Sequence, residues 1–251
     1  MNIEFFDANV FIGEPAKGCF KPAVTAAELL EEVGASEIRR ALAWHIAQHD
    51  CSPQEGNRLL SEAVSGVDAL YGCWTILPPQ TGEVIVDGFF ERMKENHIFA
   101  LRAFPDYHRF LLNRVTFGRF LAEVSERRIP LILSLEMGIG WDAVYNVLQE
   151  FPNLTCILCD IGVWNADRYF WPLLDSYSNL YVETSMLSMD AGALEAAVLH
   201  YGSERLLFGS GFPLRYPDAA VLQLLHADIS DDDKRRIAYQ NLDNLISGVR
   251  L

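Results

Sequence analysis

Short apolar runs alternate with longer amphipathic segments eight times along the chain. The runs have the length of buried strands, and the segments that follow them carry apolar residues at helical spacing. The expected strands span 3–10, 39–47, 69–78, 98–104, 129–136, 155–161, 180–185 and 205–210. The expected helices span 25–38, 52–67, 83–97, 115–128, 141–151, 166–177, 191–202, 219–227 and 231–248. Eight strand–helix units within 251 residues predict an α/β fold, a single-domain (β/α)8 TIM barrel over residues 1–251.

A doubly wound open sheet is the rival architecture for this alternation. Such a sheet usually carries a glycine-rich phosphate loop directly after its first strand. The corresponding stretch here, "DANVFIGEP", contains one glycine and lacks the G-x-G-x-x-G spacing. No linker, low-complexity segment or sequence repeat divides the chain. The barrel is therefore the preferred prediction.

The charge balance limits the classes of partner. Twenty basic residues against 34 acidic ones give a formal net charge of −14, which opposes binding to nucleic acid or to an anionic membrane surface. No apolar run is long enough to cross a bilayer, and the start "MNIEFFDANV" lacks the features of a secretory signal. Five scattered cysteines fit a reducing compartment. We therefore expect a cytoplasmic protein that binds a small molecule.

Polar side chains gather at the ends of the predicted strands, where a barrel places its active site. They are Asp7, Asn9, His45, Arg102, Ser134, Glu136, Asp160, Glu183, Ser185 and Ser210, with His108 in the loop after the fourth strand. Aromatic residues accompany them: Phe11, Trp44, Trp74, Phe104, Tyr107, Trp141, Trp164 and Phe212. Apolar walls with a few polar groups are typical of a ligand pocket, although packing alone explains several of these aromatics.

Five segments together resemble one family. They are "FFDANVFIG", "IPLILSLEMG", "EFPNLTCILCDIG", "GSERLLFGSGFP" and the tail "RRIAYQNLDNLI", and they occur in the expected order over nearly the whole chain. This set resembles the amidohydrolase superfamily, in the amidohydrolase-related branch that includes metal-dependent hydrolases and non-oxidative decarboxylases. The resemblance implies a TIM barrel with a metal site at its mouth, and family members often form homodimers.

The sequence departs from this family at the positions of the metal ligands. Asn9 and Phe11 stand where the resemblance places two histidines of the first strand, and Ser134 where it places one of the fifth. Asp160 replaces the histidine of the sixth strand, and Gly211 replaces the aspartate of the eighth. The flanking motif residues remain, which predicts that the frame of the site is kept while its ligands are changed.

These replacements remove the donors that zinc requires. Catalytic zinc is held by three protein ligands from imidazole, thiolate or carboxylate groups, and phenylalanine or glycine supplies none. Without the metal, water lacks its activator. We therefore expect no cofactor and no standard metal-dependent hydrolysis. The preferred hypothesis is a metal-free barrel that binds a small polar metabolite, with any acid–base chemistry carried by Asp160, Glu136 and His45.

The expected ligand-contacting residues of this pocket are Asp7, Asn9, Phe11, Trp74, Arg102, His108, Ser134, Glu183, Ser210 and Gly211. We expect Asn9 and Asp160 to face each other through hydrogen bonds or water, with Phe11 packed in the former metal volume. Asp160 is also a candidate ion-pair partner of Arg102 across the mouth. Asp7 has a structural alternative, as a buried residue that accepts hydrogen bonds.

Two other hypotheses stay open. In the first, Asp7, Glu136 and Asp160 hold one divalent metal through oxygen ligands, which would suit Mg²⁺ or Mn²⁺ better than Zn²⁺, and the protein is an active hydrolase or lyase acting on a small carboxylate, lactone or amide. In the second, the barrel is a non-catalytic regulatory or interaction subunit. Sequence alone leaves the substrate undefined.

Overall fold

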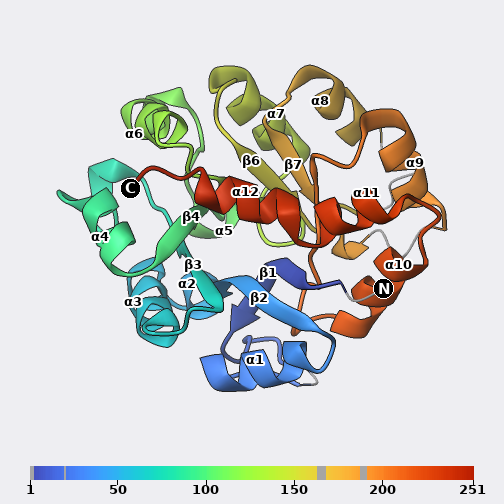
Figure 1. Ribbon diagram of the computed structural model, residues 1–251. Helices are drawn as coiled ribbons and strands as arrows, with labels where there is room; N and C mark the ends of the chain where they lie inside the picture. Colours follow the sequence, from blue (N-terminus) through green and yellow to red (C-terminus); the bar gives the residue numbers. More distant parts are fainter. Residues whose placement is uncertain (1–2, 20, 163–167, 187–190) are drawn as a thin grey trace.

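Eight parallel strands form a nearly closed barrel in the computed structural model (Figure 1). The structure describes residues 1–251 except 1–2, 20, 163–167 and 187–190. The strands are β1 (Phe5–Ile12), β2 (Ile38–His45), β3 (Leu70–Thr75), β4 (Ile98–Arg102), β5 (Leu131–Ser134), β6 (Cys156–Cys159), β7 (Leu180–Glu183) and β8 (Leu206–Leu207). Each strand pairs with the next in parallel, in the order of the sequence. The predicted (β/α)8 TIM barrel is thus confirmed.

The barrel closes between β1 and the segment that follows β8. Ala8 N donates to Phe208 O at 2.9 Å, and Gly211 N donates to Asn9 O at 3.1 Å. Farther along, Phe11 N donates to Phe212 O at 3.1 Å. These bonds continue the β8 edge beyond its two regular residues, so the 208–212 segment lies directly against the end of β1.

Helices surround the strands (Figure 1). They are α1 (Ala26–Gly34), α2 (Ala47–Asp50), α3 (Pro53–Val64), α4 (Phe89–Glu95), α5 (Pro105–His108), α6 (Arg114–Glu126), α7 (Trp141–Glu150), α8 (Phe170–Ser176), α9 (Ala193–Tyr201), α10 (Pro217–His226), α11 (Asp231–Arg235) and α12 (Asn241–Ser247). A 3-10 turn, η1 (Pro79–Thr81), precedes α4, and a π-helical turn, η3 (Arg236–Gln240), joins α11 to α12. The expected helix 166–177 lies partly outside the described residues. In the described part of the chain, no helix combines the length and the apolarity needed to cross a membrane.

Local signals set several helix ends. Thr25 caps α1 in a reciprocal capping box with Glu28, which satisfies backbone N–H groups at the helix start. The expected helix 83–97 begins only at Phe89, because Gly88 before it has φ 73°, a left-handed conformation that a helix cannot continue through. The sequence pattern therefore located these elements but overestimated the length of this one.

Two clusters of apolar side chains make up the core. One lies between the strands and the surrounding helices, and the other fills the barrel interior. Leu242 and Ile246 of α12 belong to the interior cluster, together with Phe6 and Leu207. In Figure 1, α12 runs across the barrel, and Asn241 Nδ2 fixes it by donating to Leu206 O at 2.8 Å. Since this end is covered, the site lies at the opposite end, where the strands finish.

A bulge interrupts β1 between Asp7 and Val10, where the pairing with β2 shifts register. Before the bulge, Phe6 and Ala8 point into the barrel, whereas after it Phe11 does so. The simple alternation that would place Asp7, Asn9 and Phe11 on one face is therefore broken. Bulges commonly re-aim side chains next to active sites, and this one turns Asn9 toward the barrel mouth.

Candidate functional site

Asn9 forms the centre of a buried polar network at the barrel mouth. Its amide nitrogen donates to Asp160 Oδ1 at 3.3 Å and to Glu183 Oε2 at 3.2 Å. Its amide oxygen accepts from Arg102 Nη2 at 3.0 Å. All four side chains are buried. The predicted hydrogen bond between Asn9 and Asp160 is thus confirmed, and this one amide joins the ends of β1, β4, β6 and β7.

Arg215 supplies the cation that pairs with Asp160. Its Nη1 lies 2.8 Å from Asp160 Oδ1 and its Nη2 lies 2.6 Å from Glu136 Oε2. The expected partner, Arg102, donates to Asn9 instead. Sequence reasoning missed Arg215, which lies eight residues after β8 in irregular chain. The only signal was Gly211 four residues before it, a position that lacks a side chain where the family resemblance expects one.

Two glycines make room for charged side chains at the mouth. A Cβ added at Gly211 would overlap Nη1 of Arg215 and lie 3.2 Å from its Cδ. A Cβ added at Gly209 would overlap the carboxyl group of Glu183. Gly211 also has φ 68°, a conformation that favours glycine. The segment between β8 and α10 therefore admits the Arg215 and Glu183 side chains because positions 209 and 211 carry no side chain.

Asp160 is held in an uncommon backbone conformation, with φ 57° at a residue that is not glycine. Such conformations cost about 1–3 kcal/mol and persist where surrounding contacts require them. Here the carboxylate accepts from Ser134 Oγ at 2.5 Å, besides Asn9 and Arg215. The strained turn after β6 thus directs one carboxylate onto three donors.

Burial is the largest influence on the pKa values of Glu183 and Asp7. Desolvation raises the pKa of Glu183 to about 8, with a further contribution from the negative charge of Asp160. Desolvation also raises the pKa of Asp7 to about 6, opposed by its hydrogen bonds to Ser210 and Asn9. Burial therefore favours the protonated form of Glu183.

Arg102 has fewer partners than a buried guanidinium needs. It is 1% exposed, and its Nε and Nη1 have no hydrogen-bond partner among the described residues. Its guanidinium lies over the Trp44 ring at 4.7 Å and over the Phe104 ring at 5.9 Å. The indole Nε1 of Trp44 is also buried without a partner in the described chain. Three N–H donor atoms thus lack acceptors beside Asn9.

The mouth is nearly closed. A cavity of about 10 Å³ remains, lined by Asn9, Phe11, Trp44, Met137, Asp160, Gly211, Phe212, Leu214 and Arg215. This is about the space of a single water molecule. Beside it, a groove of about 460 Å³ lies between residues 18–36 and residues 212–218. We call these two spaces the mouth cavity and the mouth groove.

Three of the predicted site residues lie away from this network. Trp74 packs in the layer between strands and helices, and its Nε1 donates to Ser61 Oγ of α3 at 3.0 Å. His45 accepts from Ala47 N at 3.1 Å, and burial lowers its pKa. Burial also lowers the pKa of His108, whose ring lies against Phe104. None of the three lines the mouth cavity.

Asp7 and Ser210 support the site without opening onto the mouth cavity. Asp7 Oδ1 accepts from Asn9 N at 2.9 Å, and both its carboxylate oxygens lie 3.1 Å from Ser210 N. Ser210 Oγ accepts from Phe212 N at 3.1 Å. Asp7 is thus the buried hydrogen-bonding residue of the structural alternative, and it ties β1 to the segment after β8. The predicted aromatic Trp164 lies outside the described residues.

The described carboxylates at the mouth already have partners within the protein. Within the described ranges, no three His, Cys, Asp or Glu side chains come together as a metal centre requires. Of the oxygen set Asp7, Glu136 and Asp160, Asp7 accepts from backbone N–H groups, and the other two form ion pairs with Arg215. In the described chain, the Arg215 guanidinium is the cation that pairs with Glu136 and Asp160.

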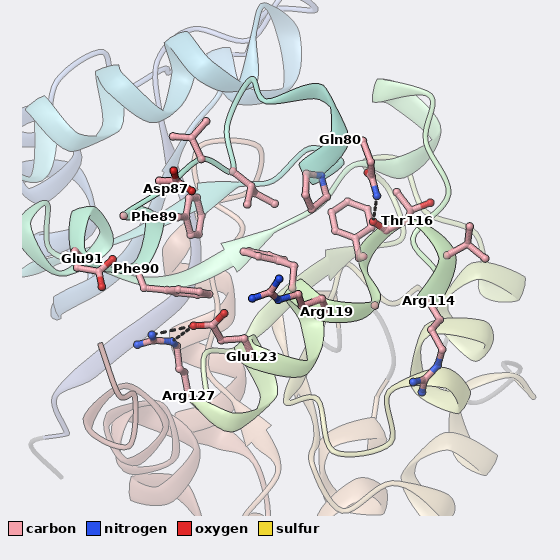
Figure 2. Close-up of a pocket in the computed structure, with 18 residues that line it drawn as sticks. Gln80, Asp87, Phe89, Phe90, Glu91, Arg114, Thr116, Arg119, Glu123 and Arg127 are labelled. Atoms are coloured by element: carbon pink, nitrogen blue, oxygen red, sulfur yellow. Dashed lines mark hydrogen bonds and ion pairs between the residues drawn. The ribbon is translucent and has the colours of Figure 1, made fainter.

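A groove larger than the mouth groove lies on the side of the barrel. It has about 620 Å³ and runs between the η1–α4 region and α6 (Figure 2). Figure 2 shows Arg127 turned toward Glu123, which it contacts at 2.9 Å, and the same guanidinium lies 4.2 Å from the Phe90 ring centre. Gln80 Nε2 spans to Thr116 O at 2.8 Å. None of the predicted site residues lines this groove.

Comparison with known proteins extends these observations. The model of the amidohydrolase family matches residues 15–241, whereas the search of curated proteins finds no match. An uncharacterised TIM-barrel protein from Bordetella bronchiseptica is similar in structure, with a TM-score of 0.75, 14% identity, and coverage of 98% of this chain and 99% of that one.

Two decarboxylases are similar as well. The 2,6-dihydroxybenzoate decarboxylase from Rhizobium has a TM-score of 0.74 at 15% identity, covering 98% of this chain and 99% of that one. A dihydroxybenzoic acid decarboxylase from a Polaromonas species, solved with bound manganese and the inhibitor 2-nitroresorcinol, has a TM-score of 0.69 at 14% identity, covering 98% and 97%. At such identities the likeness establishes the fold, while the family match covers most of the sequence. The chain therefore belongs to the amidohydrolase family.

Proposed function

We propose that this amidohydrolase-family barrel binds a small organic carboxylate at its mouth, that it does so without a metal, and that any chemistry there is metal-independent. The main support for the proposal is the set of N–H donors on the buried Arg102 guanidinium that lack an oxygen acceptor among the described residues. Its buried guanidinium donates to one oxygen acceptor, the neutral Asn9, and lies against the Cys73 thiol, and its Nε and Nη1 have no oxygen acceptor in the described chain. A buried charge is costly unless it is paired, and a carboxylate is the partner whose two oxygens match adjacent guanidinium N–H groups.

The surroundings favour a flat, apolar body on that carboxylate. Phe11 and Trp44 lie 5.0 Å apart between ring centres at the mouth, and Trp44 in turn makes a tilted contact with Phe104 at 5.4 Å. Aromatic walls with few polar groups suit an aromatic ligand. The two similar decarboxylases are named for benzoates, which makes benzoate and 2,6-dihydroxybenzoate the first probes for this chain.

Proton transfer in this site falls to Glu183 rather than to His45 or Glu136. Glu183 has a pKa of about 8, so it carries a proton at neutral pH. Its Oε2 accepts from the same Asn9 amide that contacts Asp160. A protonated carboxyl group beside a second carboxylate is the arrangement of a general acid. Glu136, in contrast, is 48% exposed and paired with Arg215.

Titration calorimetry at pH 7 tests the binding. We expect benzoate to bind and benzamide, which has the same shape without the charge, to bind at least about tenfold more weakly, because a charged partner is lost. Arg102→Met should abolish this preference. The matched control is Arg58→Met, which removes an exposed arginine of α3 that pairs with Glu55 and Glu62. Equal binding of benzamide, or no binding of either probe, would overturn the proposal.

Metal analysis tests the second half of the proposal. Protein dialysed against a chelator should bind benzoate with unchanged affinity, and added Mn²⁺ or Zn²⁺ should leave Tm unchanged. The contrary result is one tightly held metal per chain that disappears with Asp160→Ala. That outcome would restore the oxygen-ligand hypothesis. A stable protein complex together with no small-molecule binding would instead favour a non-catalytic subunit.

A further inference from the structure

The mouth cavity and the mouth groove share three lining residues, Phe212, Leu214 and Arg215. We infer that Arg215 controls passage from the mouth groove to the mouth cavity and is the first residue to bind the ligand carboxylate. A ligand enters through the mouth groove. Arg215 then keeps its ion pair with Asp160, while the ligand carboxylate replaces Glu136 as its second partner. The inference rests on the proposed carboxylate function. It adds the mouth groove as the route of the ligand, Arg215 as the residue that determines specificity, and Glu136 as the carboxylate that competes with the ligand.

The position of Arg215 makes it the closing element. Its side chain is 22% exposed, so it faces the surface on one side and the buried network on the other. Gly211 leaves the space in which the guanidinium lies. The cavity beneath holds only about 10 Å³, too little for any organic acid. A ligand that enters through the mouth groove therefore meets Arg215 before it reaches Trp44, which lines the cavity beneath.

The two ion pairs of Arg215 differ in strength. Asp160 is 5% exposed and is fixed by Ser134 and Asn9, whereas Glu136 is 48% exposed and has Arg215 as its ion-pair partner. Exposed ion pairs contribute little, less than about fivefold in an equilibrium constant, whereas breaking a buried pair is strongly unfavourable. The Glu136 contact is therefore the one that a ligand carboxylate can replace.

The mouth groove has the size and lining of a ligand site. Its volume of about 460 Å³ lies in the range of small-molecule pockets. Phe212, Pro213, Leu214 and Tyr216 form an apolar wall that leads to Arg215. Lys21 also lines it and pairs with Glu32 at 2.6 Å. A ligand with an apolar body and a carboxylate at one end fits this groove, because the apolar wall can contact the body while the carboxylate reaches Arg215.

Calorimetric titration with benzoate on three variants tests the exchange. Glu136→Gln removes the competing carboxylate, so the affinity for benzoate should rise about two- to fivefold. Arg215→Gln should lower it at least about tenfold. Glu204→Gln is the charge-matched control, because Glu204 is an exposed partner of Arg236. It should leave the affinity unchanged. Circular dichroism confirms that each variant is folded.

A second pair of variants tests the route. Ala35 lines the mouth groove, so Ala35→Trp should slow benzoate association at least about threefold, measured by stopped-flow tryptophan fluorescence. Ala122→Trp places the same bulk in a hollow beside α6 and should have no effect.

The outcomes separate the two proposals. If wild-type protein binds benzoate but Glu136→Gln binds it equally or more weakly, the exchange is wrong and the carboxylate function stands. If Ala35→Trp and Ala122→Trp associate at the wild-type rate, the route is wrong. If wild-type protein binds no carboxylate at all, both the proposed function and the inference about Arg215 are wrong.

Discussion

The Arg215 guanidinium lies where a side chain at position 211 would have to lie, and Gly211 has none. The two residues form a complementary pair, because the missing side chain admits the cation that joins Asp160 to Glu136. In the resemblance to amidohydrolases, position 211 is that of an aspartate. The structure thus connects one replacement in the sequence with a second residue that no motif marked.

Replacing Gly211 by alanine should displace Arg215. We expect a loss of about 1–3 kcal/mol in the free energy of unfolding beyond the cost of backbone strain, because the buried ion pair to Asp160 is disturbed. Gly18→Ala measures the strain alone, since Gly18 has φ 71° and nothing within 4 Å of its Cβ position. Urea denaturation of both variants gives the difference. Equal losses would show that Arg215 moves aside freely.

Gly209 likewise leaves free the space that the Glu183 carboxyl group occupies. Gly209→Ala should cost about 1–3 kcal/mol by overpacking, because its Cβ would overlap a carboxyl group that is fixed by Asn9 and Ser185. Gly34→Ala is the contrasting substitution, because Gly34 lies in α1 with open space around it. It should stabilise by up to about 1 kcal/mol. Opposite signs in urea denaturation are the expected result, and equal signs would contradict it.

Stability should fall as pH rises from about 4 to about 8. The pKa values of Asp7 and Glu183 are raised from 3.8 and 4.5 to about 6 and about 8, so the native chain holds these protons more tightly than the unfolded chain. The stabilisation is complete below the ordinary pKa values and is lost as pH passes the raised ones. Each group contributes a slope of at most about 1.4 kcal/mol per pH unit.

Glu183→Gln isolates one part of this pH dependence. The variant should show a flatter dependence of the free energy of unfolding on pH between 5 and 8, measured by urea denaturation at several pH values. Glu204→Gln, an exposed change of the same charge, should retain the wild-type slope. A Glu183→Gln slope equal to that of wild type would show that Glu183 is ionised in the native protein at neutral pH.

We expect the buried Arg102 side chain to lower the free energy of unfolding. Arg102→Met removes a buried charge that has one neutral hydrogen-bond partner, so we expect stabilisation by about 1–2 kcal/mol together with the loss of benzoate binding. Thermal and urea denaturation measure the first effect and calorimetry the second. A destabilisation of more than about 2 kcal/mol would mean that Arg102 is a structural residue.

The repeating pattern of the sequence was sufficient to predict the barrel and all eight strands. The spacing of apolar residues depends on which faces each element must bury, so it is readable without the partner elements. The strand ends also placed Asn9 and Asp160 together, because parallel strands in a barrel finish at the same end. Helix limits were less accurate where a single left-handed residue, such as Gly88, delayed the start.

Only the tertiary structure decided the character of the site. The bulge in β1 changed which side chains face the mouth, and Trp74 turned outward to Ser61. Arg215 reaches Asp160 across 55 residues of sequence from an irregular segment. Sequence periodicity fixes the faces of regular elements, whereas a long side chain from a loop finds its partner through charge and the space left by Gly211. The sequence by itself therefore determined the frame of this protein, and the packing of loops over the strand ends determined which charges meet there.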